Sequence, residues 1–190
     1  MGVMYVRIPD DRIGVLIGPG GETKRYIESR TGTSVAVDRE DGTIEVSAPD
    51  TGDPVGLMKA RDVALAIGRG FSPERAERLL RDDTYLGVID IKQISGKHEK
   101  AALWRIRSRL IGVNGRARSR IEELSGCSMS VYGATVALIG QERQLERATR
   151  AIELLLHGSE HAAVFHLLAR LRRDDAMNEA TADADEPDSE

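Results

Sequence analysis

An internal repeat constrains the fold of this chain more than any other feature of its sequence. Shifting the sequence by 94 residues aligns residues 16–37 with residues 110–131, and nine of the aligned positions are identical. In the first copy these are Leu16, Ile17, Gly18, Gly21, Ile27, Glu28, Gly32, Ser34 and Val37. Each copy spans about 70 to 75 residues, which is enough for a small domain with its own core. The 190 residues are therefore expected to form two related domains.

Each copy has the sequence pattern of three strands and three helices. In the first copy, strands are expected at residues 4–8, 34–37 and 43–46, and helices at residues 12–17, 22–31 and 54–69. In the second copy, strands are expected at residues 86–94, 129–132 and 135–139, and helices at residues 99–110, 116–124 and 141–157. The order β-α-α-β-β-α predicts an α+β fold, with a three-stranded antiparallel sheet and helices on one of its faces in each copy.

Further segments follow each copy. The predicted organisation is a first domain over residues 1–70, a connecting helix over 71–84, a second domain over 85–158, a C-terminal helix over 159–173 and a disordered acidic tail over 174–190. The tail carries eight acidic residues and no Lys or Arg. Without it, 23 acidic residues remain against 27 basic ones, so the rest of the chain has a net charge of about +4 and suits an anionic partner.

Two glycine-bounded loops indicate where such a partner binds. Gly18-Pro19-Gly20-Gly21 and Gly112-Val113-Asn114-Gly115 each lie between two predicted helices. Glycine lets the backbone approach a ligand closely, and the N-terminus of the following helix attracts phosphate. Basic residues lie close to both loops; they are Lys24 and Arg25 in the first copy, and Arg105, Arg107, Arg109, Arg116, Arg118 and Arg120 in the second.

These loops, their flanking Leu-Ile pairs and the element order resemble the type I KH domains, which hold single-stranded RNA or DNA at a G-x-x-G loop. The resemblance implies RNA binding by Ile17, Gly18, Pro19, Gly20, Gly21, Lys24, Arg25, Arg109, Ile111, Gly112, Val113, Asn114, Gly115, Arg116, Arg118 and Arg120. It also implies an apolar groove for the bases, lined by Ile13, Leu16, Ile17, Ile27 and Val35 in one copy and by Ile106, Leu110, Ile111, Ile121 and Met129 in the other. Neither loop has the internal Lys or Arg that is frequent in this family.

The arrangement of the whole chain is similar to a narrower family. Two KH modules, the segment 12–18, Ser130-Val131-Tyr132-Gly133 and the helix around 151–155 resemble the archaeal relatives of the partner-of-Nob small-subunit ribosome assembly factor. This resemblance implies binding near the 3′ end of small-subunit ribosomal RNA during ribosome maturation. It also implies two protein partners, the Nob endonuclease and the α subunit of archaeal initiation factor two.

Other classes of function are not favoured by the sequence. No apolar run approaches the roughly 20 residues that span a bilayer, so a membrane partner is not expected, and the single Cys127 indicates a reducing cytoplasm. His157, His161 and His166 lack partners that would complete a metal site, so neither a metal nor another cofactor is expected. Cys127 is expected to be a buried strand residue and Trp104 a packing residue. No catalytic constellation is visible, so the chain is not expected to be an enzyme.

Two alternatives remain open at this stage. A protein-interaction adaptor, in which one KH module docks a translation or rRNA-processing factor, competes with a tandem RNA binder because neither loop contains an internal basic residue. The acidic tail suits either a role in solubility or competition with RNA for the basic surface.

Overall fold

The computed structural model describes residues 2–38, 41–49 and 53–184. The chain divides into two compact units, and the division does not follow the repeat. One unit comprises residues 1–89 and 128–141, and the other comprises residues 90–127 and 142–190.

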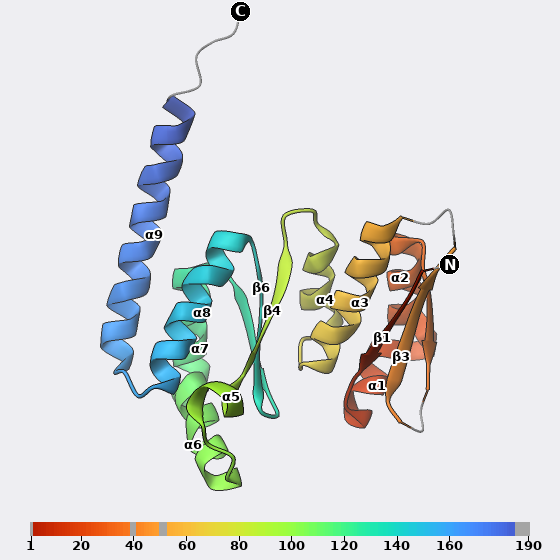
Figure 1. The fold of residues 1–190 in the computed structure, drawn as a ribbon, viewed down its shortest axis with the longest axis horizontal. Helices are drawn as coiled ribbons and strands as arrows, with labels where there is room; N and C mark the ends of the chain where they lie inside the picture. Colours follow the sequence, from red (N-terminus) through yellow and green to blue (C-terminus); the bar gives the residue numbers. More distant parts are fainter. Residues whose placement is uncertain (1, 39–40, 50–52, 185–190) are drawn as a thin grey trace, which may run out of the picture. The chain divides into compact units, whose positions relative to one another are not determined.

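The first copy in the first unit has the expected order of strands and helices. Its elements are β1 (Gly2–Arg7), α1 (Asp10–Ile17), a 3-10 turn η1 (Pro19–Gly21), α2 (Glu22–Thr31), β2 (Ser34–Val37), β3 (Thr43–Ala48) and α3 (Pro54–Gly68). The strands form an antiparallel sheet in the order β1-β3-β2, with Met4 and Val35 both paired with Val46. Figure 1 shows β1 and β3 side by side, with α3 next to them. Helix residues such as Leu16, Ile27 and Ile67 are buried in a common core with Ile44 and Val46 of β3.

The first unit also contains the strands of the second copy. After α4 (Pro73–Ala76) and the turn η2 (Glu77–Leu80) come β4 (Tyr85–Asp90) and, later in the chain, β5 (Ser128–Tyr132) and β6 (Thr135–Gly140). They form a second three-stranded sheet in the order β4-β6-β5. Ala137 and Ile139 of β6 belong to the same hydrophobic core as Phe71 and Leu79. The segment between the copies and the second sheet therefore bury apolar surface together.

Arg12 of α1 makes several polar contacts within this unit. Its guanidinium donates hydrogen bonds to the carbonyl oxygens of Ile67 (2.8 Å) and Phe71 (2.5 Å) and lies 5.9 Å from the centre of the Tyr132 ring. The Tyr132 hydroxyl in turn donates to Asp11 (2.5 Å). These contacts satisfy two carbonyl groups at the end of α3 and fix α1, the helix that leads into the first glycine loop.

Arg12→Ala is expected to lower the free energy of unfolding by about 2 kcal/mol, because two part-buried carbonyl oxygens lose a charged donor. Urea unfolding followed by circular dichroism measures this change. Arg30→Ala, which removes an exposed arginine from α2, serves as the control and should change stability by less than about 0.5 kcal/mol. Equal stability of the two variants would contradict the role given to Arg12.

The second unit contains helices alone among its described residues. They are α5 (Ile91–Ser95), α6 (Lys100–Ile111), the 3-10 turn η3 (Val113–Gly115), α7 (Arg116–Ser125), α8 (Glu142–Leu156) and α9 (His161–Ala184). Helix α9 contacts both α7 and α8, and Figure 1 shows it beside α8. Ile121, Ile152, Val164 and Leu168 are buried, so α7, α8 and α9 each contribute apolar residues to the interior.

Several sequence expectations need correction. The strand expected over 86–94 ends at Asp90, because the Asp90 carboxylate accepts hydrogen bonds from the N–H groups of Lys92 and Gln93 and begins α5. The connecting helix expected over residues 71–84 is divided into α4 and η2, which together cover residues 73–80. Trp104 is 66% exposed rather than packed, because it lies on the face of α6 opposite to the buried Ala102 and Leu110.

The C-terminal helix is longer than expected. The sequence predicts its end at residue 173 and a disordered tail from 174, whereas α9 continues to Ala184. No Gly or Pro interrupts the chain there before Pro187, and an Asp175 carboxylate oxygen accepts a hydrogen bond from Arg147 of α8. The remaining part of the predicted tail, residues 185–190, lies outside the described residues.

Candidate nucleic-acid interface

The two glycine loops have nearly the same backbone conformation. The φ and ψ angles are 73° and 173° at Gly18, and 73° and 175° at Gly112. At the third loop position they are 55° and 18° for Gly20, and 53° and 29° for Asn114. In each loop the N–H of the last glycine donates to the carbonyl oxygen of the first, at 3.1 Å and 3.2 Å. The repeat therefore builds the same turn twice, each time at the N-terminus of a ten-residue helix.

The first glycine of each loop is required by space as well as by its positive φ. A Cβ atom at Gly112 would lie 2.7 Å from the Cβ atom and 2.9 Å from the nitrogen of Ala117. At Gly18 it would lie 2.9 Å from the nitrogen of Thr23. Gly20 has no such neighbour within 4 Å. Close packing of the loop against its helix thus fixes the first position, while the third position projects outward.

In the first copy, the predicted cations contact the protein itself. The Arg25 guanidinium donates to the carbonyl oxygen of Gly20 at 2.8 Å, and the Lys24 ammonium pairs with Glu28 at 3.4 Å. Pro19 has no backbone N–H, and Glu22 places a negative charge in the first turn of α2. This loop is therefore a weak site for phosphate.

The second copy is more basic at the corresponding place. Arg116 begins α7 where Glu22 begins α2, and its side chain is exposed. Arg120 is 48% exposed and pairs with Glu123 at 2.8 Å. Val113 supplies an N–H that Pro19 lacks, and its side chain is 76% exposed. Positive charge and an accessible backbone coincide at this loop.

Two other predicted arginines are less accessible to a ligand. Arg109 donates to the carbonyl oxygens of Gly158, at 3.2 Å, and Ser159, so it holds the connection between α8 and α9. The Nε atom of Arg118 is buried and has no hydrogen-bond partner within the described parts of the chain. Of the predicted arginines, Arg116 is thus the one best placed to meet a ligand, and Arg120 lies beside it but must leave Glu123 to do so.

The predicted base-binding grooves are only partly available. Ile13, Leu16, Ile27 and Val35 are at most 7% exposed, and Leu110, Ile121 and Met129 are fully buried. The four residues of the first copy belong to the core of the first unit, because the inward face of each helix packs on other elements. Ile17, Ile106 and Ile111 remain partly exposed and keep the predicted position beside the loops.

Two residues beside the second loop were not predicted to belong to the binding site. His161 and Phe165 of α9 line a cavity of about 700 Å³ together with Gly112, Val113, Arg116 and Arg120. The Nε2 atom of His161 is 2.9 Å from the carbonyl oxygen of Arg109, and the two aromatic rings are 5.9 Å apart. The repeat gave no signal for them, because α9 follows the second copy and has no aligned counterpart in the first.

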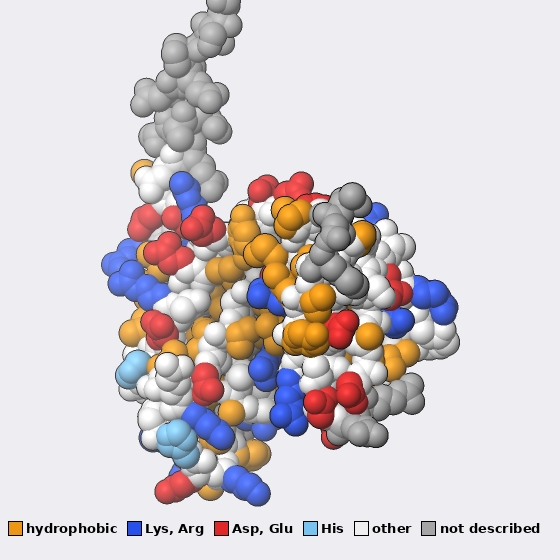
Figure 2. Space-filling view, turned by 45° about the vertical axis from the view of Figure 1, so that its right-hand side comes forward, with side chains coloured by type: hydrophobic (Ala, Val, Ile, Leu, Met, Phe, Trp, Pro, Cys, Tyr) orange, Lys and Arg blue, Asp and Glu red, His pale blue; other side chains and the backbone are white. Residues whose placement is uncertain are grey.

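Charges of both signs and hydrophobic side chains share the surface seen in Figure 2. Exposed large side chains include Tyr5, Tyr26, Tyr85 and Trp104. Cys127 is buried, as the sequence predicts, but it lies one residue before β5 rather than in a strand. Across residues 2–38, 41–49 and 53–184, no three His, Cys, Asp or Glu side chains are grouped as a metal site would require, and no helix has the length and apolar character to cross a membrane.

Both copies of the repeat match models of KH domains. A model of the KH domain matches residues 3–64. A model of the eukaryotic-type KH domain (KH-domain type I), in the form of the second domain of the partner-of-Nob (PNO1) proteins, matches residues 85–173. A KH domain-containing protein of Methanocaldococcus jannaschii is 41% identical over 172 residues, which make up 90% of this chain and 74% of that protein.

Solved structures agree with these matches. Dim2p from Pyrococcus horikoshii is 50% identical, with a TM-score of 0.84 over 90% of this chain and 99% of that one. A protein of unknown function from Aeropyrum pernix is 40% identical, with a TM-score of 0.91 over 95% of this chain and 96% of that one. The Pyrococcus horikoshii protein also matches in a complex of a/eIF2alpha, aDim2p and rRNA, at 49% identity and a TM-score of 0.85 over 91% of this chain and 95% of that one. The chain therefore belongs to the KH-domain proteins, with two KH domains in the arrangement of the archaeal Dim2p and partner-of-Nob relatives.

Proposed function

We propose that this protein binds single-stranded RNA through its two G-x-x-G loops, and that its target is the 3′ end of small-subunit ribosomal RNA during ribosome maturation. The observation that carries the proposal is the second loop, where an exposed backbone, the N-terminus of α7 and the side chains of Arg116 and Arg120 come together. Backbone N–H groups at a helix N-terminus and nearby guanidinium groups suit a phosphodiester chain. The rRNA in the complex of the Pyrococcus horikoshii relative supports the choice of target.

Two linked sites are expected to act as one. Binding at one loop makes binding at the other intramolecular, and the gain in affinity reaches about 10²-fold to 10⁴-fold when both sites fit one strand. The protein is proposed to act by binding rather than by catalysis, and to do so in the cytoplasm. RNA cleavage by the purified protein in the presence of magnesium would contradict this part of the proposal.

Protein partners form the second part of the proposal. The α subunit of archaeal initiation factor two is a proposed partner, supported by the a/eIF2alpha in the Pyrococcus horikoshii complex. The Nob endonuclease is proposed from the resemblance to the partner-of-Nob family. The first copy favours an additional role as an adaptor, because Lys24 and Arg25 contact the protein itself and Glu22 adds a negative charge.

Fluorescence anisotropy tests the RNA target. A labelled oligonucleotide with the 3′-end sequence of small-subunit rRNA is expected to bind at least about tenfold more tightly than a scrambled oligonucleotide of the same composition. If about four phosphates are contacted, affinity should fall about 50-fold as salt rises from about 50 to about 200 mM. Equal affinity for the two sequences would reject the proposed target, and an affinity that does not respond to salt would reject phosphate contact.

A further inference from the structure

A groove lies beside each glycine loop, and the two grooves are formed by corresponding residues. In the first copy eight lining residues come from α1, the glycine loop and α2, and all of them except Ile27 have a counterpart in the second groove; these seven are Gly14, Val15, Gly18, Pro19, Glu22, Thr23 and Tyr26. Adding 94 to each number gives Ser108, Arg109, Gly112, Val113, Arg116, Ala117 and Arg120, and all of these line the groove of the second copy. The duplication thus placed one groove in each copy, on equivalent helix faces.

The two grooves differ in charge. Glu22 in the first copy is replaced by Arg116 in the second, Tyr26 by Arg120, and Val15 by Arg109. The helical segment that completes each groove adds to the contrast. Glu74 and Glu77 complete the first groove, whereas His161 and Phe165 complete the second. We call the first one, defined by the lining residues of the first copy with Glu74 and Glu77, the acidic groove.

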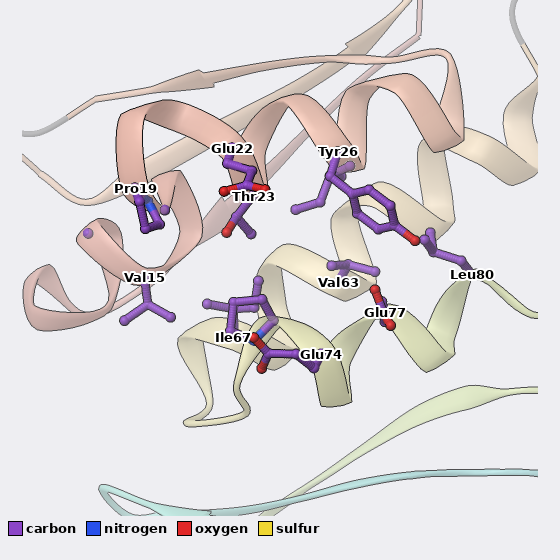
Figure 3. A pocket seen from close by; sticks show the side chains of 14 residues that line it. Val15, Pro19, Glu22, Thr23, Tyr26, Val63, Ile67, Glu74, Glu77 and Leu80 are labelled. Carbon is purple, nitrogen blue, oxygen red and sulfur yellow. The ribbon is translucent and has the colours of Figure 1, made fainter.

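The acidic groove has an apolar floor between charged walls. It encloses about 520 Å³, and Val15, Tyr26 and Leu80 give it partly exposed apolar surface above the buried Val63 and Ile67. Figure 3 shows the Tyr26 ring projecting from α2 toward Leu80, with Glu74 and Glu77 on the wall opposite α2. Tyr26 is 42% exposed, so its ring is available for contact.

The negative charge of this groove favours a positively charged ligand. Glu22, Glu74 and Glu77 are exposed carboxylates, and the lining includes no Lys or Arg. A hydrogen bond with the Ser72 side chain lowers the pKa of Glu74, so this carboxylate is negatively charged near neutral pH. Three negative charges repel a phosphodiester chain, whereas they attract Lys and Arg side chains around an apolar contact.

We propose that the acidic groove binds a basic, amphipathic segment of a protein partner, with an apolar side chain on Tyr26 and Leu80 and basic side chains against Glu22, Glu74 and Glu77. This site shares Gly18 and Pro19 with the first G-x-x-G loop, but it does not depend on phosphate binding at either loop. The duplication has thus produced a groove for a protein segment beside one loop and a basic groove beside the other.

The test uses the full chain and a fluorescein-labelled helical peptide of about 18 residues composed of Leu and Lys. The double variant Glu74→Lys with Glu77→Lys is expected to weaken binding of this peptide by at least about tenfold. The matched control is Glu142→Lys with Glu146→Lys, which makes the same change of charge at two exposed positions of α8 and should weaken it by less than about twofold. A peptide with Glu in place of Lys is expected not to bind.

Amide chemical shifts locate the site independently of charge. The Leu-Lys peptide is expected to shift the signals of Tyr26, Ile67 and Leu80. Equal weakening in the two double variants, or shifts confined to the acidic end of α9, would overturn the proposal because the peptide would then bind by net charge alone. The rRNA 3′-end oligonucleotide is measured in parallel, so that loss of peptide binding with intact RNA binding separates this site from the G-x-x-G loops.

Discussion

Replacing Val113 and Asn114 together with aspartate is expected to lower the affinity for the rRNA 3′-end oligonucleotide by about 100-fold, which corresponds to about 2.7 kcal/mol. Both side chains are exposed, so the charges enter without loss of packing. Asn114 has φ of 53°, a conformation that aspartate also tolerates. The two new carboxylates would lie where the helix N-terminus and Arg116 are proposed to hold phosphate. Anisotropy measures the loss, and thermal unfolding confirms that the variant is folded.

The first loop provides the comparison that makes this result informative. Pro19→Asp with Gly20→Asp adds the same charge to a loop of the same backbone shape, yet it is expected to lower affinity only about tenfold. The reason is that Arg25 and Lys24 already contact the protein itself and Glu22 adds a negative charge, so less phosphate binding is lost at this loop. Val55→Asp with Met58→Asp, at exposed positions of α3, controls for the change in net charge and should alter affinity by less than about twofold.

The relative loss of RNA affinity in the two loop variants tests whether the first copy mainly binds RNA or mainly docks a protein. If the first-loop variant weakens RNA binding as much as the second-loop variant, both loops hold RNA equally and the charge difference between them has no consequence. If RNA affinity does not respond to either variant, the G-x-x-G loops are not the phosphate sites. An affinity that responds only to the second loop agrees with a first copy that serves mainly as a protein-docking module.

The sequence was sufficient to predict the framework of the fold and the position of the loops. The 94-residue repeat brought Gly18 and Gly112 into register, and their φ and ψ angles agree to within a few degrees. Glycine and strand patterns are local signals, so the order of elements within each copy followed from them. The two antiparallel sheets are confirmed, as is the order β-α-α-β-β-α, to which the second copy adds the short helix α5 after its first strand.

The remaining features depend on contacts between residues far apart in the sequence. Lys24 and Arg25 look free in the sequence, but their partners are decided by where Glu28 and the Gly20 carbonyl lie in space. Phe165 lines the second groove because α9 packs on α7, and no periodic pattern in the sequence predicts that contact. Burial of Leu16 and Ile27 likewise depends on the packing of α3 and the sheet, so a family groove could not be transferred residue by residue.

Gly112→Ala is expected to destabilise the protein by about 3 kcal/mol and to reduce RNA affinity in the fraction that remains folded. The methyl group would meet the Ala117 backbone nitrogen at 2.9 Å and its Cβ atom at 2.7 Å, and an alanine at φ of 73° is strained even in open space. To relieve the contact, the loop must move away from the first turn of α7. That movement separates the backbone N–H groups of the loop from those of the helix N-terminus.

Gly115→Ala is the comparison variant, because Gly115 has a similar φ of 76° and no atom within 4 Å of the added carbon, although its ψ of 7° lies in the left-handed helical region and the ψ of 175° at Gly112 does not. It carries the conformational cost alone, so a loss of about 1 kcal/mol in the free energy of unfolding is expected, measured by urea denaturation. The difference between the two variants measures the close approach of loop and helix together with the additional strain of an alanine at the ψ of 175° of Gly112. If both variants lose the same stability, close packing at Gly112 contributes nothing, and the shared shape of the two loops is a consequence of glycine torsions rather than of their contact with the following helix.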